Sequence, residues 1–224
     1  MKTNELLKLY FVFSAIYLLA LLFDFHLVAS IAKVSLIPII FFNYYFEKGK
    51  LALIPTLILA CCFLGDVFML NFNPVTVRLF LIFFGINHLI FSLICFRSIH
   101  DLDVKKLIFS AVPVIILWFI YFNYSIKDIF GEQMGDLYPF IIIYSIVLSA
   151  FTIISLVNFF NDESKINLYP VIISVCFLIG DIMMAIDNYI VKLFFFDITI
   201  VVVKVISYYF LLKFITSYNF KRLY

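Results

Sequence analysis

The stretch LYPFIIIYSIVLSAFTIISLVNFF, residues 137–160, contains no charged side chain along its whole length. A helix rises 1.5 Å per residue, so about 20 residues cross the ~30 Å hydrocarbon layer of a bilayer. A helix on the surface of a soluble protein would carry a polar face, because one of its sides meets water. The stretch therefore predicts a membrane-spanning helix.

The rest of the chain has the same character. Hydrophobic residues make up 66% of the 224 residues and charged residues 13%, with a mean hydropathy of +1.16. Soluble domains have roughly 45–50% apolar and about 25% charged residues. Lipid must therefore be the solvent for most of this surface. The net charge of +2 argues neither for nor against an anionic partner, and we expect membrane lipids, not nucleic acid, around the chain.

Short polar breaks divide the chain into eight apolar runs of about 20 residues each. The longest break, residues 123–136, is too short for a separate domain. We therefore predict an all-α membrane protein, a single domain over residues 1–224. Its helices are predicted at Leu6–Phe23, Leu27–Phe46, Leu51–Leu70, Val75–Phe96, Lys106–Phe122, Leu137–Phe160, Leu168–Ile186 and Leu193–Ser217.

The distribution of Lys and Arg predicts the orientation, because cytoplasmic loops are enriched in these residues. With eight spans both termini share one side, which carries ten Lys and Arg residues against three on the other side. Both termini are therefore predicted to be cytoplasmic. The Ile-, Phe-, Lys- and Asn-rich composition suggests a bacterium with an AT-rich genome, hence the inner membrane.

Two similar segments indicate an internal repeat. Both contain a Gly-Asp pair inside an apolar helix, Gly65-Asp66 in the third and Gly180-Asp181 in the seventh. The aspartates are 115 residues apart, close to half the chain, and their helices are four spans apart and run in the same direction. A parallel 4+4 repeat would follow, with the two aspartates at the same depth in the outer half of the membrane.

Ionisable side chains inside the predicted spans mark the candidate site. A charge near the bilayer centre costs on the order of 2.5–3.5 kcal/mol, so such residues face the bundle interior and have partners. Counting inward from the outer helix ends places four of them within about ten residues of that surface, around one cavity, and Lys204 about eleven residues deep, level with His88. The five residues are Lys33, Asp66, His88, Asp181 and Lys204, and Tyr208 shares the Lys204 face at i+4.

The two aspartates have two interpretations. They could form salt bridges with Lys33 and Lys204 that only hold the bundle together. Alternatively they act jointly, one protonated and one ionised, because burial and mutual repulsion separate their titrations. Gly65 and Gly180 favour joint action slightly, since a glycine lets a neighbouring helix or a substrate approach the backbone.

The sequence lacks the motifs of several reaction classes. It has no HExxH, GxSxG or Walker A motif, and its four cysteines lack metal-ligand spacing. A membrane aspartyl protease would need Gly-x-Gly-Asp, but Phe63 and Leu178 occupy the first position. Serine-hydrolase, P-loop and zinc-protease chemistries therefore have no support.

The ordered set of motifs resembles the YhhN family, which includes animal lysoplasmalogenases. The resemblance covers nearly the whole chain and includes the eight-span plan. One departure is Phe80, where a small residue is expected. The matching residues are Lys33 and Pro38, Leu64-Gly65-Asp66, Phe84-x-x-x-His88-x-x-Phe91, Gly180-Asp181 and Ser207-Tyr208-Tyr209.

This resemblance implies hydrolysis of the vinyl ether bond of lysoplasmalogens, which yields a fatty aldehyde and a glycerophospho-headgroup. The chemistry that it implies requires no metal and no cofactor. Asp66 and Asp181 would be the catalytic acid and base, in an order that the sequence leaves open. Lysophospholipid would be the substrate partner. Its phosphate would be bound, or the carboxyl pair tuned, by Lys33, His88, Lys204 and Tyr208.

Two other classes remain open. The same intramembrane charges would serve a small transporter or lipid-binding protein, in which they relay a proton or a substrate. They would also serve a structural membrane protein, in which they are internal ion pairs and nothing more.

Overall fold

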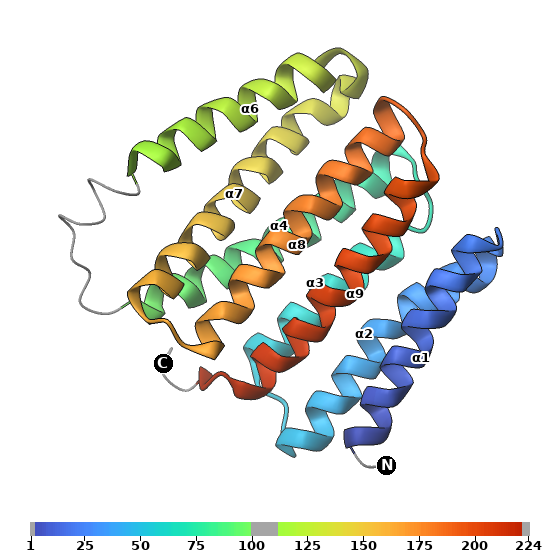
Figure 1. Ribbon diagram of the computed structural model, residues 1–224, viewed down its shortest axis with the longest axis vertical. Coiled ribbons are helices and arrows are strands. Elements are labelled where there is room, and N and C mark those ends of the chain that lie inside the picture. The colour runs from blue at the N-terminus through green and yellow to red at the C-terminus, as the bar shows by residue number, and fades with distance from the viewer. Residues whose placement is uncertain (1–2, 100–111, 221–224) are drawn as a thin grey trace.

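The computed structural model describes residues 3–99 and 112–220, and all regular structure in this part is helical. This part forms eight α-helices (Figure 1). Their bounds are α1 (Thr3–Leu22), α2 (His26–Lys48), α3 (Leu53–Phe68), α4 (Pro74–Ser98), α6 (Val112–Met134), α7 (Tyr138–Asn161), α8 (Lys165–Tyr189) and α9 (Phe194–Ser217). One 3₁₀ turn, η1 (Gly135–Leu137), joins α6 to α7; short turns join the other consecutive helices, apart from α4 and α6, between which residues 100–111 are not described.

Six of these helices are long and apolar enough to cross a membrane: α1, α2, α4, α7, α8 and α9. The predicted membrane-protein class is therefore confirmed. Helix α3 has 16 residues and spans roughly 24 Å at 1.5 Å per residue. It is shorter at both ends than the predicted Leu51–Leu70.

The predicted break at residues 123–136 is wrong, because α6 continues to Met134. Asn123 does not end the helix; its side-chain amide donates to the Phe119 carbonyl within it, at 2.8 Å. Apolar residues recur at helical spacing beyond that point, at Ile126, Ile129 and Phe130. The helix ends at Gly135, whose φ of +48° favours glycine. The start of the predicted fifth helix, residues 106–111, lies outside the described residues.

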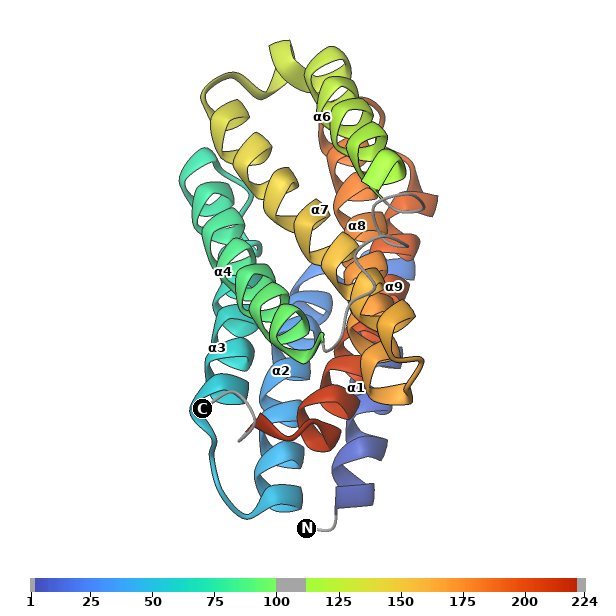
Figure 2. The same ribbon diagram turned by 90° about the vertical axis from the view of Figure 1, so that its left-hand side faces the viewer.

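Consecutive helices run in alternating directions, and the start of α1 and the end of α9 lie toward the same end of the bundle (Figures 1 and 2). The opposite end holds the α1–α2, α3–α4 and α8–α9 turns, and we call it the distal end. Asn73 fixes one of these turns, because its side-chain oxygen accepts from the Val75 and Thr76 backbone N–H groups at 3.1 and 3.0 Å. The 4+4 repeat and the cytoplasmic side of the termini stay predictions.

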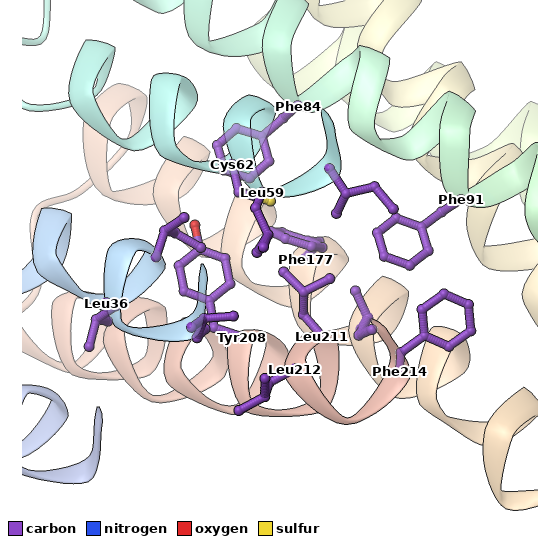
Figure 3. Close-up of a cluster of buried hydrophobic side chains, with 14 of the residues drawn as sticks. Leu36, Leu59, Cys62, Phe84, Phe91, Phe177, Tyr208, Leu211, Leu212 and Phe214 are labelled. Atoms are coloured by element: carbon purple, nitrogen blue, oxygen red, sulfur yellow. The ribbon is translucent and has the colours of Figure 1, made fainter. Parts of the chain in front are cut away.

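An aromatic and aliphatic core joins α2, α3, α4, α8 and α9 (Figure 3). Phe91, for example, stacks on Phe151 of α7 at 5.2 Å and packs against Phe214 of α9 at 5.5 Å between ring centroids. Large apolar side chains also cover the outside; Leu27 and Leu117 are 75% and 68% exposed. Such a surface fits a lipid environment.

Helix α7 carries a stripe of small polar side chains that faces its neighbours. Interhelical hydrogen bonds matter here, since lipid provides no hydrophobic force between helices. Trp118 of α6 donates to Ser149 at 3.3 Å, and Ser155 bonds to Ser174 of α8 at 3.1 Å. These bonds hold α6 and α8 on α7. The buried stripe consists of Ser145, Ser149, Thr152, Ser155 and Asn158.

Candidate functional site

Asp66 lies in the last turn of α3 with its side chain fully buried. Its Oδ1 forms an ion pair with the Lys204 ammonium group of α9. Its Oδ2 accepts a hydrogen bond of 2.6 Å from the Tyr208 hydroxyl, one helical turn further along α9. We call these three residues the Asp66 cluster; in it the charge of the buried carboxylate is compensated.

The ring of Phe84 on α4 forms one wall of the Asp66 cluster. The Lys204 Nζ lies 5.6 Å from the centre of this ring and 5.8 Å from the centre of the Tyr208 ring. Both distances fall within the range of cation–π attraction. The aromatic walls therefore stabilise the Lys204 cation next to its carboxylate.

Asp181 on α8 belongs to a second group, the Asp181 cluster. The Tyr144 hydroxyl of α7 donates to Asp181 Oδ2 at 2.6 Å and lies 3.0 Å from His88 Nε2 of α4. His88 is fully buried and stacks on Phe151, with ring centroids 5.6 Å apart and an interplanar angle of 18°. Three helices thus meet at the Tyr144 hydroxyl.

A small pocket of about 60 Å³ lies between the two clusters. Much of its lining is apolar, and we call it the polar pocket after the charged side chains that also line it. Both Asp181 and Lys204 line it, together with Lys33 of α2 and Tyr17 of α1. Within the described residues Lys33 has no carboxylate within 4 Å, whereas Lys204 has Asp66. With Asp181 protonated and Lys33 charged, this pocket would therefore carry one uncompensated positive charge.

A second, larger space of about 360 Å³ lies between α4, α6, α7 and α8, and we call it the apolar chamber. Apolar side chains such as Leu148 and Leu178 form nearly all of its wall, and Tyr144 and Asp181 bring polar atoms into it. Met69, Phe80, Asp181 and Met184 line both spaces, so the polar pocket and the apolar chamber adjoin there. Asp66 lines neither space.

The predicted site residues therefore gather in one region. Helix positions put most of them in the distal half, with His88 near the middle of α4. The structure joins Lys204 and Tyr208, which share one face of α9, to Asp66. Of the two salt bridges in the first interpretation the described residues show one, and Lys33 forms none with either aspartate. No hydrogen bond joins the two carboxyls, and each has its own tyrosine. The residues concerned are Lys33, Asp66, His88, Asp181, Lys204 and Tyr208.

Sequence reasoning missed Tyr144, which connects His88 to Asp181. The chain has fourteen tyrosines, and nothing in the local sequence distinguishes this one as a site residue. Its one signal is its place beside Ser145, at the start of the polar stripe of α7. That signal gains meaning after the order of helices in the bundle is known.

This arrangement defines a class of protein: a multi-pass helical membrane protein with an intramembrane polar pocket that adjoins an apolar chamber. The described residues offer no group of three or more His, Cys, Asp and Glu side chains arranged to hold a metal ion. The chain belongs to the YhhN family, whose model matches residues 28–215 and so includes all six predicted site residues. Neither a curated protein nor a solved structure matches the chain.

Proposed function

We propose that this protein is a membrane-embedded hydrolase that cleaves the vinyl ether bond of lysoplasmalogens. The observation that carries the proposal is the position of Asp181, which is among the residues that line both the polar pocket and the apolar chamber. An amphiphile with its headgroup in the first and its chain in the second would present the bond between them to this carboxyl.

The polar pocket suits a phosphate group. Lys33 and Lys204 both line it, and Asp66 compensates one of the two positive charges. An anionic headgroup would neutralise the other, through hydrogen bonds strengthened by charge. In this proposal Asp66 and Tyr208 act through Lys204, which they hold in place.

The apolar chamber suits a single hydrocarbon chain. Its volume of about 360 Å³ falls in the ~300–1,000 Å³ range of pockets for small molecules. The wall is apolar over α4, α6, α7 and α8, so an alkyl chain would lose no hydrogen bonds on entering.

The family resemblance implies Asp66 and Asp181 as an acid and base pair. We propose that Asp181 serves both roles in turn, because Asp66 is ion-paired with Lys204 and lines neither space. Protonated Asp181 transfers its proton to the vinyl carbon β to the ether oxygen, which leaves an oxocarbenium ion. Water adds to the cationic carbon, and the Asp181 carboxylate accepts the proton that this water releases. The resulting hemiacetal then breaks into aldehyde and the free glycerol hydroxyl. This follows the acid–base logic of glycoside hydrolysis.

Purified protein in lipid nanodiscs, incubated with lysoplasmenyl-ethanolamine, tests the proposal by aldehyde release. Loss of a general acid costs roughly 10²–10⁴-fold, so Asp181→Asn should lose at least a hundredfold in rate. Asp24→Asn is the matched control: Asp24 lies in the α1–α2 turn at φ +58°, which asparagine tolerates.

Three results would contradict parts of the proposal. Wild-type protein that releases no aldehyde would overturn the hydrolase function. Undiminished activity of Asp181→Asn would overturn the role of this carboxyl. Recovery of unchanged lipid with the protein, without aldehyde, would favour a lipid carrier instead.

A further inference from the structure

The Tyr144 hydroxyl has two polar neighbours and one proton. It lies 2.6 Å from Asp181 Oδ2 and 3.0 Å from His88 Nε2. The hydroxyl donates its proton to Asp181 Oδ2, which accepts whether or not Oδ1 carries the catalytic proton. The hydroxyl oxygen must then accept from His88, which requires the proton of the imidazole to be on Nε2.

The surroundings of His88 favour the same tautomer. Its Nδ1 is buried and has no hydrogen-bond partner among the residues that the structure describes. A proton on Nδ1 would be a buried donor without an acceptor, whereas a proton on Nε2 has the Tyr144 oxygen. The ring is also fixed in orientation, because Phe151 stacks on it and Phe177 contacts it edge-on at 5.1 Å.

We propose that His88 and Tyr144 are positioning residues for Asp181. His88 Nε2–H donates to the Tyr144 oxygen, Tyr144 donates to Asp181 Oδ2, and Asp181 Oδ1 is left free to exchange the proton with substrate and water. This inference rests on the proposed hydrolase function. It adds Tyr144 to the site and assigns the two carboxyl oxygens different roles.

The chain of donors should affect turnover more than substrate binding. The headgroup would bind through Lys33 and Lys204 in the polar pocket, and neither lysine contacts Tyr144 by a hydrogen bond or ion pair within the described residues. Without Tyr144 the carboxyl group of Asp181 can rotate, and a small misplacement of a reacting group costs up to about a hundredfold. Substitution of a residue needed only for packing would lower the stability of the protein but would not lower kcat selectively at a nearly unchanged KM.

Substitutions of matched geometry test the chain through aldehyde release. Tyr144→Phe should lower kcat about 10- to 100-fold and change KM less than about threefold. The amide nitrogen of glutamine matches Nε2, whereas that of asparagine matches Nδ1. His88→Gln should therefore retain most of the activity, and His88→Asn and His88→Leu should resemble Tyr144→Phe. Tyr124→Phe, on the exposed face of α6, is the control and should match wild type.

The double variant Tyr144→Phe with His88→Leu adds a test of linkage. Substitutions within one series of hydrogen bonds do not have additive effects on the rate. The double variant should therefore be no slower than Tyr144→Phe alone. A loss of kcat in the double variant equal to the product of the two single losses would contradict the proposed hydrogen bonds from His88 through Tyr144 to Asp181. A His88→Gln variant as slow as His88→Leu would also contradict these hydrogen bonds. Aldehyde release by the wild type would still support the hydrolase function in that case.

Nitrogen-15 NMR of protein labelled at histidine tests the hydrogen bonds from His88 to Asp181 without an activity assay. The sequence has three histidines, and the His88→Gln variant identifies the His88 signals. The expected spectrum shows a protonated Nε2 and an unprotonated Nδ1, with the Nε2 signal displaced in Tyr144→Phe. A protonated Nδ1 would contradict the chain, even in a protein that releases no aldehyde and whose proposed function has failed.

Discussion

Phe84 packs so closely on Gly65 that a Cβ atom at position 65 would overlap its ring. The glycine precedes Asp66, and the same ring lies 5.6 Å from the Lys204 ammonium group. The glycine of this Gly-Asp pair thus allows α4 to close over the carboxylate and its lysine. At the second pair the fit is looser, since a Cβ at Gly180 would meet Val203 Cγ2 at 3.1 Å.

Gly65→Ala should destabilise the protein. A methyl group forced against a packed ring typically costs about 1–3 kcal/mol. Gly85→Ala is the matched control in the next helix, because its Cβ would meet its nearest neighbour, Tyr144 Cδ2, at an ordinary 3.8 Å. Thermal unfolding in detergent should show a lower midpoint for Gly65→Ala and an unchanged or higher one for Gly85→Ala; equal midpoints would contradict the close packing.

The Asp66–Lys204 pair should show strong coupling. Removal of one partner leaves a buried charge uncompensated, which costs about 3–5 kcal/mol. Asp66→Asn and Lys204→Met should each destabilise the protein, and the double variant should be clearly more stable than the sum of the two effects predicts. Unfolding of all three variants measures the coupling, and simple additivity would argue against a paired state.

The depth of the site could be predicted from the sequence, because helix rise and span limits fix how far Lys33, Asp66 and Asp181 lie from a helix end. The choice of partners could not. Lys204 of α9 reaches Asp66 of α3 in a bundle where α9 packs on α8, α2 and α1, an arrangement that depends on the order and rotation of the helices. Two carboxyls at similar depth therefore looked like one pair and turned out to have separate tyrosine partners.

The apolar chamber was also beyond the sequence. One of its walls is the second half of α6. Polar residues such as Asn123 and Lys127 in this half led to the prediction of a loop. In the helix Lys127 is exposed, and Asn123 donates to its own backbone and accepts from Ser145 of α7. Ile126 and Phe130 line the chamber. Local polarity was a poor guide there, because an amphipathic helix mixes both kinds of residue.

Lys33→Met should weaken headgroup binding. A hydrogen bond to a charged group contributes about 1.5–3 kcal/mol, so KM should rise at least about tenfold with a smaller change in kcat. Lys213→Met is the control: Lys213 is on α9, where its ammonium group lies 5.5 Å from the Tyr209 ring, and it does not line the polar pocket. Equal KM values for Lys33→Met and wild type would remove Lys33 from the phosphate site.

Ala185→Phe should fill part of the apolar chamber. Ala185 lies one turn after Asp181 on α8 and lines the chamber. Its enlargement should raise KM about tenfold for a long-chain vinyl ether and much less for a short-chain analogue, since the shorter chain leaves the filled volume empty. Ala60→Phe, on an exposed position of α3, should leave both values unchanged. An equal loss for both chain lengths would speak against a chain site there.

The fate of the proton tests the central claim, that Asp181 protonates the vinyl carbon, most directly. The reaction is run in D₂O, the aldehyde is trapped as a hydrazone, and deuterium is located by mass spectrometry. Wild type should give aldehyde with one deuterium on the carbon next to the carbonyl, and Asp181→Asn should give almost none of this product. Aldehyde without deuterium at that carbon, or labelled aldehyde formed equally fast by Asp181→Asn, would contradict the account.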